Sequence, residues 1–142
     1  MAIAQAVCNS FKQQILEGVH NFATGGNTFK LSLYTSAANL SASTTVYTST
    51  NEVSNTGQYS AGGGTLTGQQ TSLDTGVAIV DFADLSFTGV TLTAAGALIY
   101  NTSASNKAVC VLDFGGDKTA TAGTFTIVFP AFTSANAILR IS

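Results

Sequence analysis

Asp81 and Asp84 are the two acidic residues whose type and spacing could support hydrolysis of a glycan. A glycosidase needs two carboxyl groups held about 5 to 10 Å apart across a sugar cleft, one of them desolvated. Asp81 falls at a polar position of a predicted strand, 77–82, and Asp84 follows in a predicted turn. Both positions favour solvent-facing or turn-capping roles. We therefore predict no catalytic residues and keep a small glycan hydrolase as one alternative.

The segment 115–119 ends in a Lys-Thr pair like that of a phosphate-binding loop. Such a loop needs glycine directly before the lysine and opens a helix, whereas Asp117 stands at that position here. A carboxylate there would repel phosphate, and the following residues resemble a turn into a strand. The glycines of 62–64 are not followed by a helical pattern either. We expect no cofactor, and we assign Asp113 and Asp117 to a turn between them.

His20 is the only histidine, so the sequence has no histidine cluster for zinc, and we expect no metal site. A Ser-His-Asp triad would depend on this one residue at the end of a predicted helix. A cation close to the last carbonyl groups of that helix is the simpler role. Cys8 lies in a helical pattern and Cys110 in a strand pattern. They could form one disulfide, but two buried thiols fit better.

The chain has 142 residues, of which 45% are hydrophobic and 8% charged, with a net charge of -2. This length and hydrophobicity predict a single domain, 1–142, with one core. The five basic residues stand singly, so we expect no nucleic-acid partner. The longest apolar runs are far shorter than the about 18 residues of a membrane-spanning helix, and no basic, apolar leader opens the chain. We expect neither a membrane partner nor export.

An N-terminal amphipathic helix is predicted over 2–22. Ile3, Val7, Phe11 and Ile15 recur every four residues and form one apolar stripe, with polar residues away from it. The alanine-rich composition favours a helix, and a glycine pair beyond it stops the helix. We expect this helix either to pack on the β-strands or to be presented to a groove of a partner.

From residue 28 onward, apolar and polar residues alternate, which is typical of half-buried strands. Clusters of Gly, Asn, Ser and Asp separate the runs, and no helical spacer follows. The predicted strands are 29–34, 44–48, 66–70, 77–82, 92–100, 108–114, 124–129 and 137–141. The sequence predicts an all-β fold, an antiparallel β-sandwich or jelly roll over 28–142 with one N-terminal α-helix.

The longest stretch without strand alternation is the glycine-rich loop 52–64. Loops of this length in compact domains are either disordered or used for contacts, and a tyrosine within this one favours contacts. The edge of the last predicted strand, 137–141, is a further contact candidate. The residues expected at partner contacts are Glu52, Gln58, Tyr59, Gly62 and Gly63 in the loop and Phe11 and Ile15 on the helix.

Several segments, in their order along the chain, resemble a family of small virion structural proteins of tailed bacteriophages. They are the opening Met-Ala-Ile-Ala-Gln-Ala-Val-Cys, the Gly-Val-His-Asn-Phe segment at 18–22, the stretch 51–68, and Val-Asp-Phe-Ala-Asp at 80–84 with Ala-Ala-Gly-Ala at 94–97. The likeness covers nearly the whole chain. Gln58 departs from it as an extra residue between Gly57 and Tyr59.

The resemblance implies a capsid decoration, or cement, protein whose partner is the major capsid protein. Such a protein is made in the host cytoplasm, sits on the outer capsid surface of the virion and bridges neighbouring capsid subunits. Low charge and open strand edges favour self-association of this chain into dimers or trimers. Each copy would add a modest binding energy, which the capsid lattice multiplies.

Two other functions stay open. A tail or head-fibre component that binds a host-surface glycan would need tyrosines for stacking, because the chain has no tryptophan, and would gather them on one loop rim. The four tyrosines are scattered along the sequence, which weighs against that function. A glycan hydrolase using Asp81 and Asp84 would lose its activity in the Asp84→Asn variant.

Overall fold

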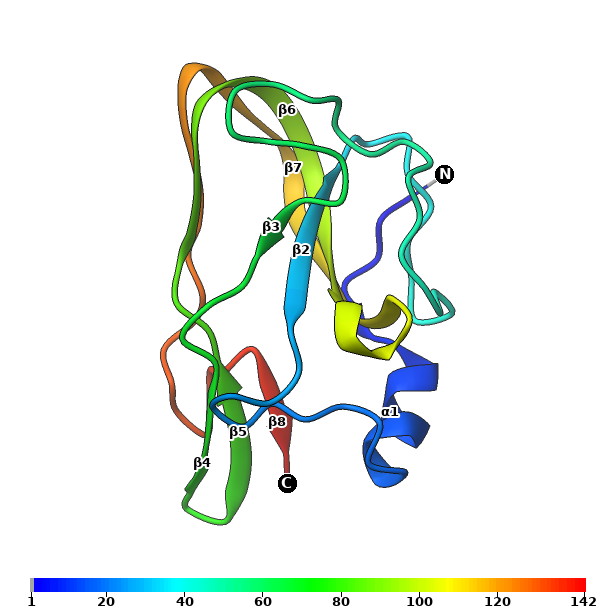
Figure 1. The fold of residues 1–142 in the computed structure, drawn as a ribbon, viewed down its shortest axis with the longest axis vertical. Helices are drawn as coiled ribbons and strands as arrows, with labels where there is room; N and C mark the ends of the chain where they lie inside the picture. Colours follow the sequence, from blue (N-terminus) through cyan, green and yellow to red (C-terminus); the bar gives the residue numbers. More distant parts are fainter. Residues whose placement is uncertain (1) are drawn as a thin grey trace.

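The computed structural model describes residues 2–142 as two antiparallel β-sheets with one short α-helix (Figure 1). The larger sheet has the order β1-β7-β6-β2-β3, with β1 (Ala6–Val7), β2 (Phe29–Tyr34), β3 (Gly64–Thr65), β6 (Leu85–Asn101) and β7 (Lys107–Ile127). The smaller sheet has the order β4-β5-β8, with β4 (Gln70–Asp74), β5 (Val77–Asp81) and β8 (Leu139–Ile141). The helices are α1 (Asn9–Leu16) and the 3-10 turn η1 (Thr102–Ala104). The predicted all-β class with one N-terminal α-helix is confirmed.

The β6–β7 hairpin is the longest paired element, and it contributes to two sides of the molecule. Its two strands pair from Leu85 opposite Ile127 to Asn101 opposite Lys107. In Figure 1 β6 rises along one side, turns over at the top and descends beside β2, and β7 follows the same course in the opposite direction. β2 pairs only with 96–101 of β6, so the rest of β6 pairs with β7 alone and forms a two-stranded extension of the larger sheet.

A bulge interrupts β7 where the sequence predicted a turn between Asp113 and Asp117. Residues 114–117 face a single residue of β6, because Ala94 pairs with Lys118 and Gly96 pairs with Asp113. The predicted strands 108–114 and 124–129 are therefore parts of one strand. A β-bulge bends and twists its strand, so this irregularity contributes to the curvature of the hairpin.

The predicted helix 2–22 is wrong at both ends, since α1 covers only Asn9–Leu16. Residues before it are extended: Ala6 pairs with Val111 in β7, and the Cys8 N–H donates to the Val109 carbonyl at 3.0 Å. The open edge of β7 competes with the helix for these backbone groups, and strand pairing satisfies them inside the core. At the other end the chain turns at Gly18, which has φ +73°.

Two predicted strands do not form where the sequence placed them. The segment 44–48 makes one isolated bridge, Val46 with Lys107, because β1 occupies the β7 edge beyond it. Residues 66–69 are irregular; β3 ends before them and β4 begins after them. The prediction over 77–82 is confirmed as β5, and that over 137–141 is shortened to β8.

Aromatic rings join the N-terminal segment to the sheets. Phe22 and Phe29 stack with their centroids 4.4 Å apart, and Phe82, directly after β5, meets Phe29 edge-on at 5.9 Å. Such rings supply much of the buried apolar area of a core. Cys8 and Cys110 are free buried thiols, as predicted. Burial raises the pKa of Cys8 to about 11, so this thiol is protonated at neutral pH.

Gly63 lies where the long loop approaches β2 closely, and Gly76, in the turn between β4 and β5, is a matched glycine in open space. They have nearly the same backbone angle, φ +84° and +85°. A Cβ on Gly63 would lie 1.8 Å from the Leu31 carbonyl oxygen, whereas a Cβ on Gly76 would meet nothing within 4 Å. Gly76→Ala should therefore lower the free energy of unfolding by about 1–2 kcal/mol, from left-handed strain alone.

Gly63→Ala should lower the free energy of unfolding by more than about 3 kcal/mol, because the loop must also move away from β2. Urea unfolding of the two variants, with the m value checked in each, measures the difference. Equal losses in the two variants would contradict the close approach.

Candidate contact surface

Glu52 holds the long loop, 46–64, onto the larger sheet. Its carboxylate accepts hydrogen bonds from the hydroxyl groups of Tyr47 and Tyr59, the latter at 2.7 Å, and from the Gly62 N–H at 2.7 Å. Its backbone forms an antiparallel bridge to the end of β2. Hydrogen bonds to a charged group contribute about 1.5–3 kcal/mol each, so this one residue fixes much of the loop.

All four tyrosines of the chain gather around Glu52. The Tyr34 hydroxyl donates to a loop carbonyl at 2.6 Å, and the Tyr100 hydroxyl donates to another. The rings of Tyr47 and Tyr100 stack with centroids 4.8 Å apart. Burial, with a smaller contribution from the Glu52 charge, raises the pKa of Tyr34 and Tyr100 to about 12 and raises those of Tyr47 and Tyr59 as well. These hydroxyl groups stay protonated and act as donors.

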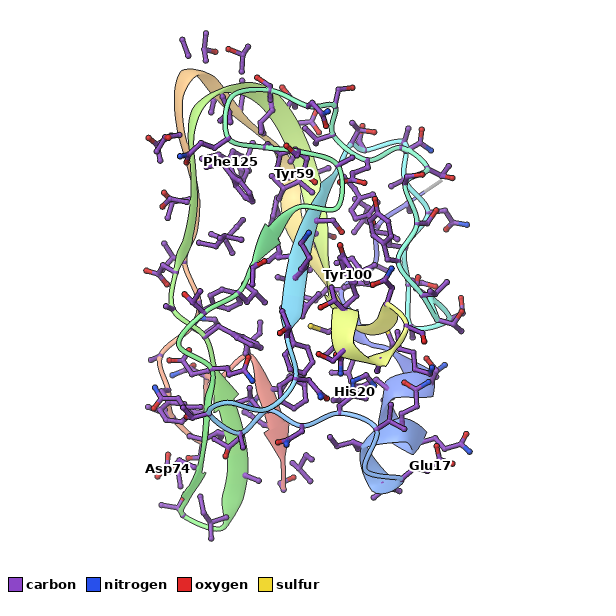
Figure 2. All side chains as sticks on the ribbon, viewed as in Figure 1. Glu17, His20, Tyr59, Asp74, Tyr100 and Phe125 are labelled. Carbon is purple, nitrogen blue, oxygen red and sulfur yellow. The ribbon has the colours of Figure 1, made fainter. Side chains whose placement is uncertain are left out.

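This packing shows where the contact residues predicted in the loop lie. Tyr59 is fully buried, with its ring between the loop and β6 (Figure 2). Glu52 is half-buried with its carboxylate turned to the tyrosines, Gly62 is buried, and Gly63 lies against β2. Gln58 is exposed, and its side-chain oxygen accepts from a β6 N–H at 3.0 Å. The loop is a packed part of the fold.

His20 is not the helix-end cation that the sequence predicted. Its ring is 5% exposed, with Nδ1 3.0 Å from the Asn101 amide nitrogen and Nε2 2.9 Å from the Gln14 side-chain oxygen. Because an amide nitrogen only donates, Nδ1 accepts and Nε2–H donates. Burial, and secondarily the charge of Lys107, lowers the pKa of His20 to about 4. A neutral His20 therefore ties α1 to the end of β6.

Two of the acidic residues singled out in the sequence accept hydrogen bonds from backbone N–H groups. Asp84 accepts from an N–H just beyond β7 at 3.0 Å, and Asp113 accepts from the Gly115 N–H at 2.9 Å. Asp81 is half-buried at the end of β5. Within residues 2–142, no group of three or more His, Cys, Asp and Glu side chains could hold a metal ion. No helix of this part of the chain has the length and apolar character needed to cross a membrane.

An apolar groove of about 760 Å³ lies between α1 and the smaller sheet, and we call it the α1–β8 groove. Phe11 and Ile15, the two helix residues predicted at contacts, line it together with Leu139 and Ile141 of β8. Leu16 at its side is 88% exposed, and Ile141 is 59% exposed. Phe11 and Leu139 are buried, so Ile15, Leu16 and Ile141 are the accessible ones among these apolar side chains. Open apolar side chains around a groove mark an interaction site.

All charged side chains that line the α1–β8 groove are positive. Lys12 and Arg140, two of the five basic residues, line it, and none of the seven acidic residues does. Sequence reasoning missed Lys12 and Leu16 as contact residues, because no local pattern shows that α1 lies beside β8. Arg140 and Ile141 belong to the strand 137–141, whose edge the sequence named as a contact candidate. The one available signal is the apolar stripe of α1.

No protein family, curated protein or solved structure matches this chain.

Replacing Glu52 tests its role as the loop anchor. Glu52→Ala should lower the free energy of unfolding by about 3 kcal/mol, because it leaves three donors without their acceptor. Glu17→Ala removes an exposed carboxylate and should change it by less than about 0.5 kcal/mol. Urea unfolding with near-ultraviolet dichroism of the tyrosines measures both. A loss no larger for Glu52→Ala than for Glu17→Ala would contradict the anchor.

His20 makes the stability of the fold depend on pH. Its pKa is near 6.5 when unfolded and about 4 when folded, so the unfolded chain binds more protons between these values. The contribution of neutral His20 is complete above about pH 6.5 and is lost as the pH falls toward 4. Between pH 7 and 4.5 the free energy of unfolding of the wild type should fall by about 2 kcal/mol more than that of the His20→Gln variant. Urea unfolding at both pH values measures this, and parallel losses would show that His20 is not held neutral.

Proposed function

We propose that this chain is a non-enzymatic structural protein of a tailed-bacteriophage virion. In this proposal it is a decoration or cement protein that binds the outside of the head and bridges major capsid subunits. The residue-level resemblance to small virion proteins supports it. The observation that carries it is the α1–β8 groove, whose exposed apolar side chains suit docking on another protein. A jelly roll is the finer fold that goes with this proposal, supported by the two antiparallel sheets.

The proposed mechanism is burial of apolar surface without any chemical step. Burying one large apolar side chain contributes about 1.5–3 kcal/mol. Ile15, Leu16 and Ile141 would thus contribute several kcal/mol per copy, part of which offsets the lost freedom of the bound protein. Association as a dimer or trimer, repeated over a lattice, turns such modest contacts into strong attachment.

The alternative, a tail or head-fibre component that binds a host glycan, is less well supported by the tyrosines. Tyr34, Tyr59 and Tyr100 are buried. Tyr47 stacks on Tyr100 and donates to Glu52. The rings on which a sugar would stack are therefore engaged in anchoring the loop, which favours head binding.

Purified protein should co-sediment with expanded, undecorated heads of the source phage at a fixed ratio to capsid subunits, and it should not co-sediment with host cells. Leu16→Asp should weaken head binding by about tenfold or more, because it places a charge in an apolar contact. Val128→Asp is the matched control, since Val128 is 71% exposed but lies outside the groove. It should bind heads like the wild type.

Two outcomes would contradict this account. Binding to cells and not to heads would favour the fibre alternative. An equal loss of head binding in the Leu16→Asp and Val128→Asp variants would exclude the groove as the contact surface.

A further inference from the structure

β8 is an edge strand that borders the α1–β8 groove. It pairs with β5 on one side, and within residues 2–142 no backbone hydrogen bond joins 139–141 to any other segment. Figure 1 shows α1 on the side of β8 away from β5, and both elements line the same groove. An open strand edge beside an apolar groove is the arrangement to which an extended peptide adds as a further strand.

The side chains of β8 define what such a peptide must carry. Side chains alternate between the two faces of a strand, so Leu139 and Ile141 share one face and Arg140 lies on the other. Residues directly opposite each other on paired strands interact. A matching strand would therefore alternate apolar residues with residues of opposite charge to Arg140, and Lys12 on α1 adds a second positive charge. The groove volume of about 760 Å³ lies within the roughly 300–1,000 Å³ range of binding pockets.

A second copy of this chain fits that edge poorly. Two copies related by a two-fold axis would pair β8 with β8 in antiparallel fashion. In the register that pairs all three residues of β8, the middle residue Arg140 would lie opposite Arg140 of the other copy. Like charges directly opposite each other destabilise a strand pair. Charge complementarity thus favours an acidic partner.

We propose that the α1–β8 groove binds an extended segment of a partner protein in which apolar residues alternate with acidic residues. The segment pairs with β8 as a fourth strand of the smaller sheet, places its apolar side chains beside Ile15, Leu16 and Ile141, and its carboxylates near Lys12 and Arg140. This binding mode deepens the proposed function and rests on it for the identity of the partner, a segment of a capsid subunit. The binding itself is tested without heads.

The probe is a short capped peptide in which valine alternates with aspartate, labelled for fluorescence anisotropy. It should bind saturably to the full chain. A peptide with lysine in place of aspartate, and one with alternate backbone nitrogens methylated, should bind about tenfold or more weakly, because they lose the charge match or the strand hydrogen bonds. Lys12→Glu should weaken binding of the aspartate peptide by about fivefold or more.

Lys118→Glu is the matched control, because it makes the same change in net charge at an exposed lysine outside the groove, and it should bind the peptide like the wild type. Absence of saturable binding, equal binding of the lysine or methylated peptide, or equal effects of the two lysine variants would overturn the inference. If the peptide binds as expected but heads do not bind the protein, the proposed function fails and the groove assignment stands. If heads bind equally well to wild type and Lys12→Glu while the peptide does not bind, the inference fails and the proposed function stands.

Discussion

Hydrogen bonds to the carboxylate of Glu52 determine how the long loop, 46–64, lies on the larger sheet. The tyrosines around it are apolar enough to be buried, and the hydroxyl groups of Tyr47 and Tyr59 donate to this one anion of the cluster. Burial raises the pKa of each tyrosine, so the donors stay protonated. The loop in turn covers the free edge of β2, next to β3. A segment that looks like a contact loop in the sequence is therefore part of the packed fold.

With the loop committed to packing, the open surface lies at the other end of the molecule. The curved β6–β7 hairpin leaves room for a second, smaller sheet, and β8 brings the last described residues beside α1 (Figure 1). His20 keeps α1 attached to the end of β6 through Asn101. Phe11 is then buried while Leu16 remains open. The groove between α1 and β8 therefore follows from the attachment of α1 to β6 and from the pairing of β8 with β5.

Local patterns were sufficient for strands in which apolar and polar residues alternate clearly. The alternation at 77–82 predicted β5, and that at 29–34 predicted β2. The helix 2–22 was overestimated because the pairing of Ala6 and Val7 with β7 is set more than a hundred residues away. The roles of Glu52 and His20 were not predictable from local patterns either. Glu52 binds side chains and backbone of its own irregular loop, which has no periodic pattern, and His20 depends on Asn101, 81 residues away. Of the predicted contact residues, Ile15 lies in the accessible part of the groove, whereas Tyr59 is buried.

The central claim is that this chain meets its partner through the α1–β8 groove. Amide hydrogen exchange of the full chain, free and bound to undecorated heads, tests this most directly, because exchange reports which backbone groups become protected. We expect new protection in α1 and in β8, with little change in the loop 52–64. Protection concentrated in that loop, with α1 and β8 unchanged on bound heads, would contradict the claim.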